Sequence, residues 1–268
     1  MEIDKITITG GYDRLGEKES VDKIEFKMGD IASIVGPTGS GKTAFINDIE
    51  LFANENTPSR RKVSINDEDP TNKLLDPSQN PIALITQHTN FLSDLPVNKF
   101  LNIHAKIRKL NSSHTVEETL DFANQLTGEP IIEENRMTEL SGGQTRSLLI
   151  ADAVVIGNSP IILLDEIENA GIHRTKAIDL LKQYRKIFIF VTHDPRIALF
   201  SDFRVVMKNG GMYKVIETVA EEKEILTEIE KIDDVLLFCR RAIREGGQLT
   251  LEDLEDIKAR LRELGYIN

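Results

Sequence analysis

The chain has 268 residues and a formal net charge of −11, with 40% hydrophobic and 29% charged residues. This length can bury a sizeable hydrophobic core, and the composition is that of a folded globular protein. The acidic balance argues against a general affinity for nucleic acid, and the longest apolar runs are only strand-sized, far below the roughly 20 residues of a membrane-spanning helix.

The N-terminus and the cysteine content give no sign of export. Residues 1–7 lack the basic start and the apolar core of a secretory signal. The one cysteine, Cys239, has no partner for an internal disulfide. We therefore expect a cytoplasmic protein that has no nucleic-acid partner.

The first third of the chain predicts short strands and one helix. Apolar or β-branched patterns predict strands at 5–9, 23–27, 31–35 and 63–65. The third strand runs into a glycine-rich segment, after which apolar residues at helical spacing predict a helix over 44–52. The polar stretch 54–81 is interpreted as loops, and the basic cluster Arg60, Arg61 and Lys62 as a solvated turn without a role.

The middle of the chain predicts helices between strands. Residues 82–86 predict a buried strand, and a helical subdomain is expected over about 95–150, with a turn at 110–113. From residue 161 onward, strands and helices alternate, which is typical of a parallel sheet. The expected strands are 161–164, 187–191 and 204–207, and the expected helices are 174–184 and 195–200.

The C-terminal part predicts an acidic pair of helices. From 211 to 268, 14 acidic and 9 basic residues give −5, nearly half of the net charge. One helix is predicted over 220–245, and a second begins at a capping box from Thr250 to Asp253 and stops near Gly265. The first helix has an apolar stripe that requires a cover; a dimer contact, a partner dock and a lid on the sheet all remain open.

The glycine-rich segment matches the phosphate-binding pattern G-x-x-x-x-G-K-[ST]. Its residues are Gly36, Pro37, Thr38, Gly39, Ser40, Gly41, Lys42 and Thr43. Glycines let backbone N–H groups contact phosphate oxygens, and the N-terminus of the following helix adds a favourable dipole. Lys42 supplies a positive charge, and the Thr43 hydroxyl can bind a Mg²⁺ ion that bridges the β- and γ-phosphates. The segment therefore predicts binding of ATP with Mg²⁺.

Two carboxylates end a buried strand. The apolar run 161–164 stops at Asp165 and Glu166. Ligands of open α/β sheets bind at the carboxyl edge, so Asp165 is suited to hold Mg²⁺ through water and Glu166 to orient or deprotonate the attacking water. Beside a phosphate-binding loop, this pair predicts ATP hydrolysis.

A second predicted helix N-terminus contains two consecutive glycines. Its residues are Leu140, Ser141, Gly142, Gly143 and Gln144, and they precede a predicted helix over 145–156. Such a terminus can bind a phosphate too, although the nucleotide already has its loop at residues 36–43. With this LSGGQ sequence, the chain resembles the ATP-binding cassette (ABC) ATPases, whose other motifs occur here in the family's order over about residues 3–212.

The resemblance implies the fold class and the division of the chain. It implies an α/β P-loop NTPase core with a mostly parallel sheet, an antiparallel β subdomain and a helical subdomain. The ABC-type ATPase domain would span residues 1–212, and residues 213–268 would form the acidic C-terminal helical extension.

The resemblance also implies roles that the residue pattern alone does not assign. Gln87 would sense Mg²⁺ and the γ-phosphate, His193 would contact the γ-phosphate and support Glu166, and Tyr12 would stack on the adenine. The implied Mg²⁺ ligands are Thr43, Gln87 and, through water, Asp165. The signature residues 140–144 would close over a nucleotide held by another cassette, which implies a head-to-tail dimer with itself or with a related ABC subunit.

The segment after Glu166 departs from the family pattern. Residues 167–173 read IENAGIH, so this loop, the D-loop of the family, is one residue longer than in transport members and has His173 in place of its closing aspartate. We expect the contacts that this loop makes across the dimer, and the coupling between the two sites, to differ.

Three candidate functions are compatible with these motifs. The altered D-loop and the acidic tail narrowly favour a soluble ATPase that loads, activates or remodels a protein partner. The alternative is the ATP-binding subunit of a membrane transporter, peripheral on the inner face of the membrane, with residues 89–97 available to contact a membrane subunit. A DNA-maintenance ATPase is a remote third hypothesis, because the chain lacks a long coiled-coil insertion and the charge is unfavourable.

Overall fold

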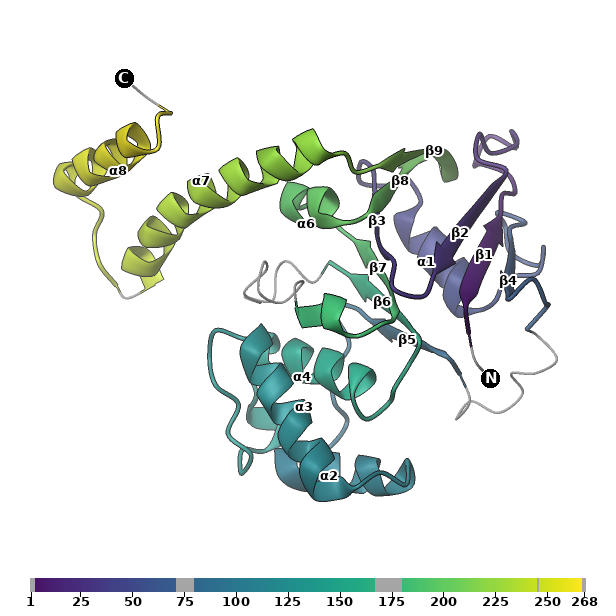
Figure 1. Cartoon of the computed structure of the whole chain (residues 1–268), viewed down its shortest axis with the longest axis horizontal. Helices are drawn as coiled ribbons and strands as arrows, with labels where there is room; N and C mark the ends of the chain where they lie inside the picture. Colours follow the sequence, from purple (N-terminus) through teal and green to yellow (C-terminus); the bar gives the residue numbers. More distant parts are fainter. Residues whose placement is uncertain (1–2, 71–79, 167–179, 245, 267–268) are drawn as a thin grey trace. The chain divides into compact units, whose positions relative to one another are not determined.

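The computed structural model describes residues 3–70, 80–166, 180–244 and 246–266. The chain divides into two compact units, one ending at Glu217 and the other beginning at Thr218, and each is described by itself. The first unit is mixed α/β, with one mostly parallel and one antiparallel sheet, which confirms the predicted fold class (Figure 1).

A six-stranded sheet forms the centre of the first unit. Its strands are β3 (Ile31–Val35), β5 (Ile82–Ile85), β6 (Ile161–Asp165), β7 (Ile187–Val191), β8 (Phe203–Lys208) and β9 (Gly211–Glu217). They lie in the order β5-β6-β7-β3-β8-β9. All neighbours are parallel except β8 and β9. The central strands read as continuous apolar runs because both faces of the sheet are covered.

A smaller antiparallel sheet shares a core with helix α1 (Lys42–Glu50). Its strands are β1 (Lys5–Thr9), β2 (Lys23–Lys27) and β4 (Lys62–Ile65), in the order β2-β1-β4. Ile6 of the central strand pairs with Phe26 on one side and with Ile65 on the other. These side chains are buried together with Phe45 and Ile49 of α1. This sheet is the expected antiparallel β subdomain.

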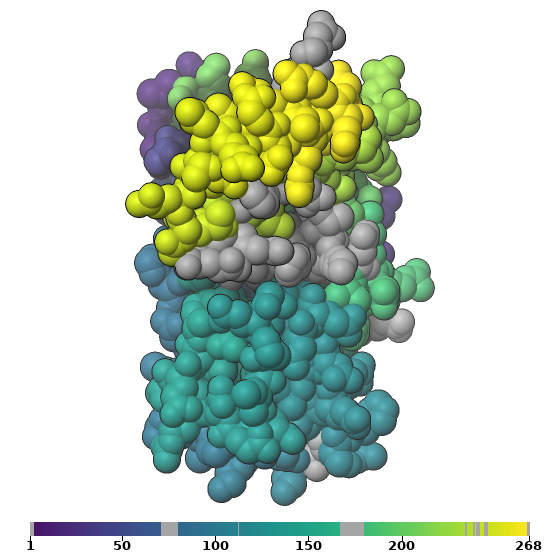
Figure 2. Space-filling view, turned by 90° about the vertical axis from the view of Figure 1, so that its left-hand side faces the viewer, coloured from purple at the N-terminus to yellow at the C-terminus, as the bar shows by residue number. Residues whose placement is uncertain are grey.

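Helices fill the segment between β5 and β6, drawn in teal in Figures 1 and 2, where the space-filling view shows them as one block. They are α2 (Val97–Ile107), α3 (Ser112–Leu126), the 3-10 helix η2 (Met137–Glu139) and α4 (Gly142–Val154). Leu101 of α2, Phe122 of α3 and Leu148 of α4 belong to one buried core. The segment lies within the helical subdomain predicted over about 95–150.

The two faces of the six-stranded sheet are covered by different elements, because successive side chains of a strand point to opposite faces. On β6, Ile161 and Leu163 share a core with α1 and the antiparallel sheet. Ile162 and Leu164 share a core with the helices of the 97–154 segment. Helices α1 and α4 therefore lie on opposite faces of the sheet.

The first unit closes with the hairpin of β8 and β9, after the short helix α6 (Pro195–Phe200). The sequence predicted no strand after Gly210, and its proposed boundary at residue 212 falls inside β9. The unit extends to Glu217 because β9 pairs along its length with β8.

The second unit consists of α7 (Ala220–Arg244) and α8 (Leu251–Glu263). The predicted capping box is present: the Thr250 hydroxyl accepts from the backbone N–H of Asp253 (3.2 Å), and the Asp253 carboxylate accepts from the backbone N–H of Thr250 (2.7 Å). Of the apolar stripe on α7, Ile225 and Leu236 are about half exposed. No helix in the described part of the chain is both long and apolar enough to span a membrane.

Candidate active site

The strand order gathers the predicted site at one edge of the central sheet. Gln87 follows β5, Asp165 and Glu166 end β6, His193 follows β7, and the phosphate-binding loop follows β3. These four strands are neighbours in the order β5-β6-β7-β3, and all are parallel. Their carboxyl ends therefore meet at the same edge, which is the ligand-binding edge of open α/β sheets.

The phosphate-binding loop needs its glycines for both conformation and space. Gly36, Gly39 and Gly41 have φ angles of 148°, 78° and 100°, in the region that favours glycine. A Cβ atom on Gly41 would lie 2.6 Å from Cα of Gly210, and one on Gly36 would lie 2.5 Å from the carbonyl oxygen of Met207. The turn between β8 and β9 thus closes around the loop, and the backbone N–H of Gly210 donates to the Ser40 carbonyl (2.8 Å).

Polar groups inside the loop fit a phosphate. Lys42 is only 7% exposed, and its Nζ folds back to donate to the carbonyls of Gly36 (2.9 Å) and Pro37 (3.3 Å). The Ser40 hydroxyl is buried and has no hydrogen-bond partner among the described residues. A phosphate oxygen would supply the missing partner and a counter-charge for Lys42.

The end of β6 has an unusual backbone. Asp165 is paired with Val191 of β7, and the N–H of Glu166 donates to the carbonyl of the same Val191 (3.0 Å). Glu166 has a φ of 51°, a left-handed conformation that is uncommon for a residue with a side chain and that occurs frequently at functional sites. Both carboxylates are half-buried. This turn supports the hypothesis that Glu166 has a catalytic role.

Two further predicted residues lie on neighbouring strand ends. Gln87 is exposed, and its backbone carbonyl accepts a hydrogen bond from the guanidinium of Arg146 in α4 (2.7 Å). His193 is exposed just beyond β7, where the N–H of Thr192 donates to the Ile34 carbonyl (3.3 Å) and so ties the end of β7 to β3. Strand order thus brings both side chains to the edge of the sheet that carries Glu166.

The residues present fit a Mg²⁺ ion, which needs oxygen ligands and shares them with the phosphates of its nucleotide. Thr43 has an exposed position in the first turn of α1, directly after Lys42. Asp165 and Gln87 follow the adjacent strands β6 and β5. When bound, Mg²⁺ would neutralise charge on the β- and γ-phosphates.

Tyr12 lies in the loop between β1 and β2 and exposes 44% of its surface. Its backbone N–H donates to the Ser59 carbonyl (2.7 Å), and the guanidinium of Arg60 lies 5.8 Å from its ring centroid. The neighbouring Arg14 donates from its guanidinium to the carbonyl of Gly39 in the phosphate-binding loop (2.8 Å). An exposed ring two residues before this contact with the loop suits stacking on a base.

The signature residues form the N-terminus of α4. Ser141 caps the helix: its hydroxyl accepts from the N–H of Gln144 (3.3 Å), and the Gln144 side chain accepts from the N–H of Ser141 (2.9 Å). Gln144 also donates to the Pro130 carbonyl (2.9 Å), and Leu140 is half-buried against the helical core. This capping box holds Gly142 and Gly143 at the helix terminus, where a phosphate is favoured.

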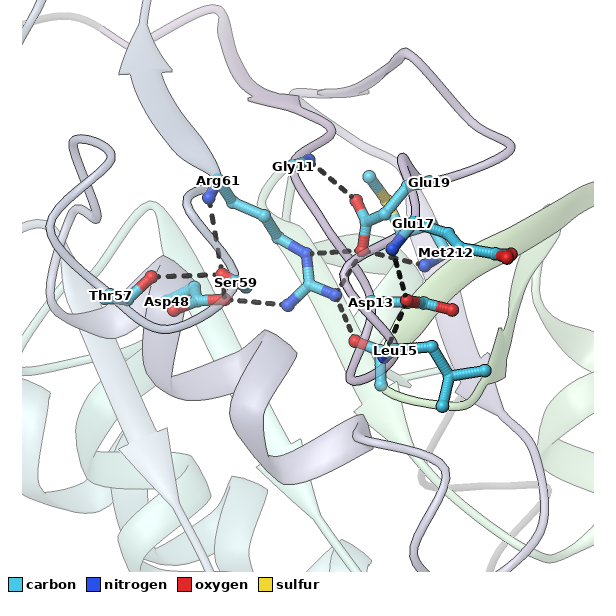
Figure 3. A network of polar contacts seen from close by, with 11 residues as sticks. Gly11, Asp13, Leu15, Glu17, Glu19, Asp48, Thr57, Ser59, Arg61 and Met212 are labelled. Carbon is cyan, nitrogen blue, oxygen red and sulfur yellow. Dashed lines mark hydrogen bonds and ion pairs between the residues drawn. The ribbon is translucent and has the colours of Figure 1, made fainter.

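One buried residue was misinterpreted from the sequence. Arg61, assigned to a solvated turn without a role, is fully buried in a polar network (Figure 3). Its guanidinium contacts the carboxylates of Glu19 and Asp48. Sequence patterns do not reveal such a network, because its carboxylates come from distant segments. The available signal was Asp48, a polar residue on the core-facing side of the predicted helix that became α1.

Two predictions lie outside the described residues. One is the D-loop at 167–173 with His173, and the other is most of the helix expected over 174–184.

The fold and the site define a P-loop nucleotide-binding protein. A family model described as "ABC transporter" matches residues 21–169, more than half of the chain. An uncharacterized ABC transporter ATP-binding protein of Methanocaldococcus jannaschii is 49% identical, and the alignment covers 95% of this chain and 98% of the relative. The chain therefore belongs to the ABC transporter family of ATP-binding proteins.

Further comparisons agree with this membership. A thiamine import ATP-binding protein of Brucella suis is 31% identical over 68% of this chain and 76% of the relative. The solved structure of an ATP-binding cassette of an ABC transporter, in its ADP conformation, superposes with a TM-score of 0.59 and 26% identity, covering 85% of this chain and 96% of that one. The protein is thus an ABC ATPase that binds ATP and hydrolyses it to ADP and phosphate.

Proposed function

We propose that this chain is the ATP-hydrolysing subunit of a membrane transporter and that it works as a dimer. The observation that carries the ATP-hydrolysing part of the proposal is the strand order, which brings Gln87, Glu166, His193 and the phosphate-binding loop to one edge of the sheet. Each of these groups has a part to play in the transfer of a phosphoryl group to water.

The chemistry follows from the position of each group. Backbone N–H groups of residues 36–43 and Lys42 hold the β- and γ-phosphates. Glu166 accepts a hydrogen bond from a water molecule in line with the γ-phosphorus and takes its proton as the water oxygen bonds to phosphorus, while the bond from the γ-phosphorus to the β–γ bridging oxygen breaks and ADP leaves. Gln87 and His193 contact the γ-phosphate side of the site, so both sense whether that phosphate is present.

A second cassette is needed because the signature motif and the phosphate-binding loop of one chain lie at helices on opposite sheet faces. Helix α1 packs on the face that carries Leu163, and α4 packs on the face that carries Leu164. In the proposed head-to-tail dimer, Ser141 to Gln144 of each chain close over the ATP held by the other chain. Loss of the γ-phosphate weakens this closure and releases the two halves.

The transporter assignment is supported by relatives and by the surface beside Gln87. The relatives named above are transporter ATP-binding proteins, which favours a membrane partner over the soluble partner that the sequence narrowly favoured. After Gln87, the chain presents Leu92 fully exposed and Leu95 39% exposed. A loop that exposes two leucines between β5 and the helical segment suits docking of a membrane subunit, with the chain on the cytoplasmic face of the membrane.

Site-directed photo-crosslinking tests this proposal. A photo-reactive phenylalanine analogue is placed at Leu92, and a matched variant carries it at Leu51, which is 68% exposed at the end of α1. We expect an adduct with a multi-span membrane protein in detergent-solubilised membranes from position 92 and not from position 51. Adducts from position 92 with soluble proteins alone would overturn the transporter proposal in favour of a soluble partner.

A further inference from the structure

Arg61 occupies the centre of a buried polar network at the start of β4 (Figure 3). Its guanidinium donates to the Glu19 carboxylate from Nε (3.0 Å) and also from a terminal nitrogen, and to the Asp48 carboxylate (2.7 Å). The side chains of Arg61 and Glu19 are 0% exposed, and that of Asp48 is 6% exposed. Charges buried this deeply require partners on every side, so the geometry of the network is strongly constrained.

The Glu19 carboxylate extends the network to two backbone segments. One oxygen accepts from the N–H of Gly11 (3.1 Å), next to Tyr12. The other accepts from the N–H of Met212 at the start of β9 (2.9 Å). Glu19 therefore holds the segment of Tyr12 and the β8–β9 hairpin to the same arginine.

Arg61 reaches the phosphate-binding loop by two routes. Its guanidinium donates to the Gly210 carbonyl (2.6 Å), and the N–H of Gly210 in turn donates to the carbonyl of Ser40 in the loop (2.8 Å). The second route passes through Asp48, which lies on α1, the helix that continues the loop. The arginine is thus connected both to the phosphate-binding loop, at Ser40, and to the helix that follows the loop, at Asp48.

The backbone that carries Arg61 also holds Tyr12. The carbonyl of Ser59 accepts from the N–H of Tyr12, and the approach is so close that a Cβ atom on Gly11 would lie 1.9 Å from this carbonyl oxygen. The Ser59 hydroxyl donates to Asp48 (2.8 Å) and accepts from the N–H of Arg61 (3.3 Å). The segment that carries Tyr12 is therefore fixed to the same group of residues as the phosphate-binding loop.

We infer that Arg61 is a positioning residue for the nucleotide: it sets the Tyr12 ring at a fixed place relative to the phosphate-binding loop. The inference rests on the proposed stacking of Tyr12 on adenine. An arginine is required because its planar fork of donors reaches two carboxylates and a carbonyl at once. A lysine keeps the charge and lacks that fork, so it leaves one or more of these acceptors without a donor.

The test compares ATP with inorganic tripolyphosphate, which occupies the phosphate-binding loop and has no base. In the full-length chain, we expect Arg61→Lys to raise the Kd and the KM for ATP about tenfold, with kcat at saturating ATP and the Kd for tripolyphosphate nearly unchanged. Tyr12→Ala should likewise weaken the binding of ATP and leave the binding of tripolyphosphate nearly unchanged. In the double variant the two losses should not add, because both act through the same contact. Arg108→Lys, at an exposed site in the helical segment, is the matched control.

The outcomes separate this inference from the proposed stacking. If Tyr12→Ala leaves ATP affinity unchanged, both the stacking and the inference are wrong. Only the inference is overturned if Tyr12→Ala weakens ATP binding while Arg61→Lys leaves it unchanged. The same holds if Arg61→Lys weakens the binding of ATP and of tripolyphosphate equally. Glu19→Gln provides a second variant should Arg61→Lys fail to fold; it keeps an acceptor for Gly11 and should show the same selective loss for ATP, whereas wild-type behaviour would overturn the inference.

Discussion

The guanidinium of Arg146, in the first turns of α4, donates to the backbone carbonyl of Gln87 at 2.7 Å. This bond joins the helix that begins with the signature motif to the end of β5, so the two regions expected to respond to the γ-phosphate are in direct contact. It concerns the backbone of Gln87, whose side-chain amide nitrogen lies 3.2 Å from Nε2 of the neighbouring His88.

Removal of this contact should impair hydrolysis more than binding. We expect Arg146→Ala to lower the steady-state ATPase rate several-fold, because a hydrogen bond to a charged donor contributes about 1.5–3 kcal/mol and Gln87 loses a support. The Kd for ATP should change by less than twofold in calorimetry. Arg108→Ala is the control, and an unchanged rate for Arg146→Ala would contradict the prediction.

Lys42 should be required for nucleotide affinity. Its Nζ donates to the carbonyls of Gly36 and Pro37, and it is the one lysine among residues 36–43. We expect Lys42→Ala to weaken ATP binding by about tenfold to a hundredfold, as the loss of a charge-assisted hydrogen bond implies. Equilibrium binding of a fluorescent ATP analogue measures the change, with Lys258→Ala as the control. Undiminished affinity would contradict the assignment of the loop.

Two glycine substitutions separate backbone strain from crowding. Gly16 and Gly41 both have positive φ angles, of 79° and 100°, but a Cβ atom on Gly16 meets nothing within 4 Å. We expect Gly16→Ala to reduce the free energy of unfolding by about 1 kcal/mol and to retain ATP affinity. Gly41→Ala should lose more stability and also ATP affinity, because its Cβ collides with Gly210. Denaturant unfolding and calorimetry measure the two effects, and equal behaviour of the variants would refute this explanation.

Glu166→Gln should separate hydrolysis from closure. The amide cannot take a proton from water, so we expect turnover to fall by at least about a hundredfold, while ATP binding persists. With ATP, the variant should elute from a sizing column as a dimer, and without ATP as a monomer. Glu129→Gln, at an exposed position, should behave as the wild type does. A Glu166→Gln chain that stays monomeric with ATP would contradict the proposed head-to-tail dimer.

Lys186 predicts a dependence of stability on pH. Burial lowers the pKa of this lysine from 10.5 to about 8, and its Nζ donates to Asn158 (2.7 Å) and to the Ser159 carbonyl (3.0 Å). Between pH 8 and 10.5 the unfolded chain keeps a proton that the folded chain has lost, so unfolding takes up a proton and becomes less favourable as pH rises. The contribution of this residue to stability therefore increases from pH 8 toward pH 10.

The matching experiment compares the wild type with Lys186→Met by chemical denaturation from pH 7 to 9.5. We expect the difference in the free energy of unfolding to shift in favour of the wild type as pH rises. A difference that is independent of pH would show that the lysine titrates normally in the folded chain.

Much of this protein was determined by local sequence. The strands of the central sheet up to Lys208, the helical segment and the capping box at Thr250 follow from apolar periodicity and from capping residues, which act over a few neighbours. The phosphate-binding loop could also be predicted from the sequence, because glycines at fixed spacing are needed wherever a backbone encloses a phosphate. The sequence could therefore identify groups that we propose contact the nucleotide.

Only the tertiary structure decided how those groups come together. The order β5-β6-β7-β3 places Gln87, Glu166 and His193 at one edge, and this order depends on pairing between strands distant in the chain. The strand β9 was missed because its pairing with β8, and not a strong apolar pattern, defines it. The burial of Arg61 likewise depends on carboxylates 42 and 13 residues away in the chain. Local patterns carry no record of such distant partners, because pairing and burial are set by the packing of the whole unit.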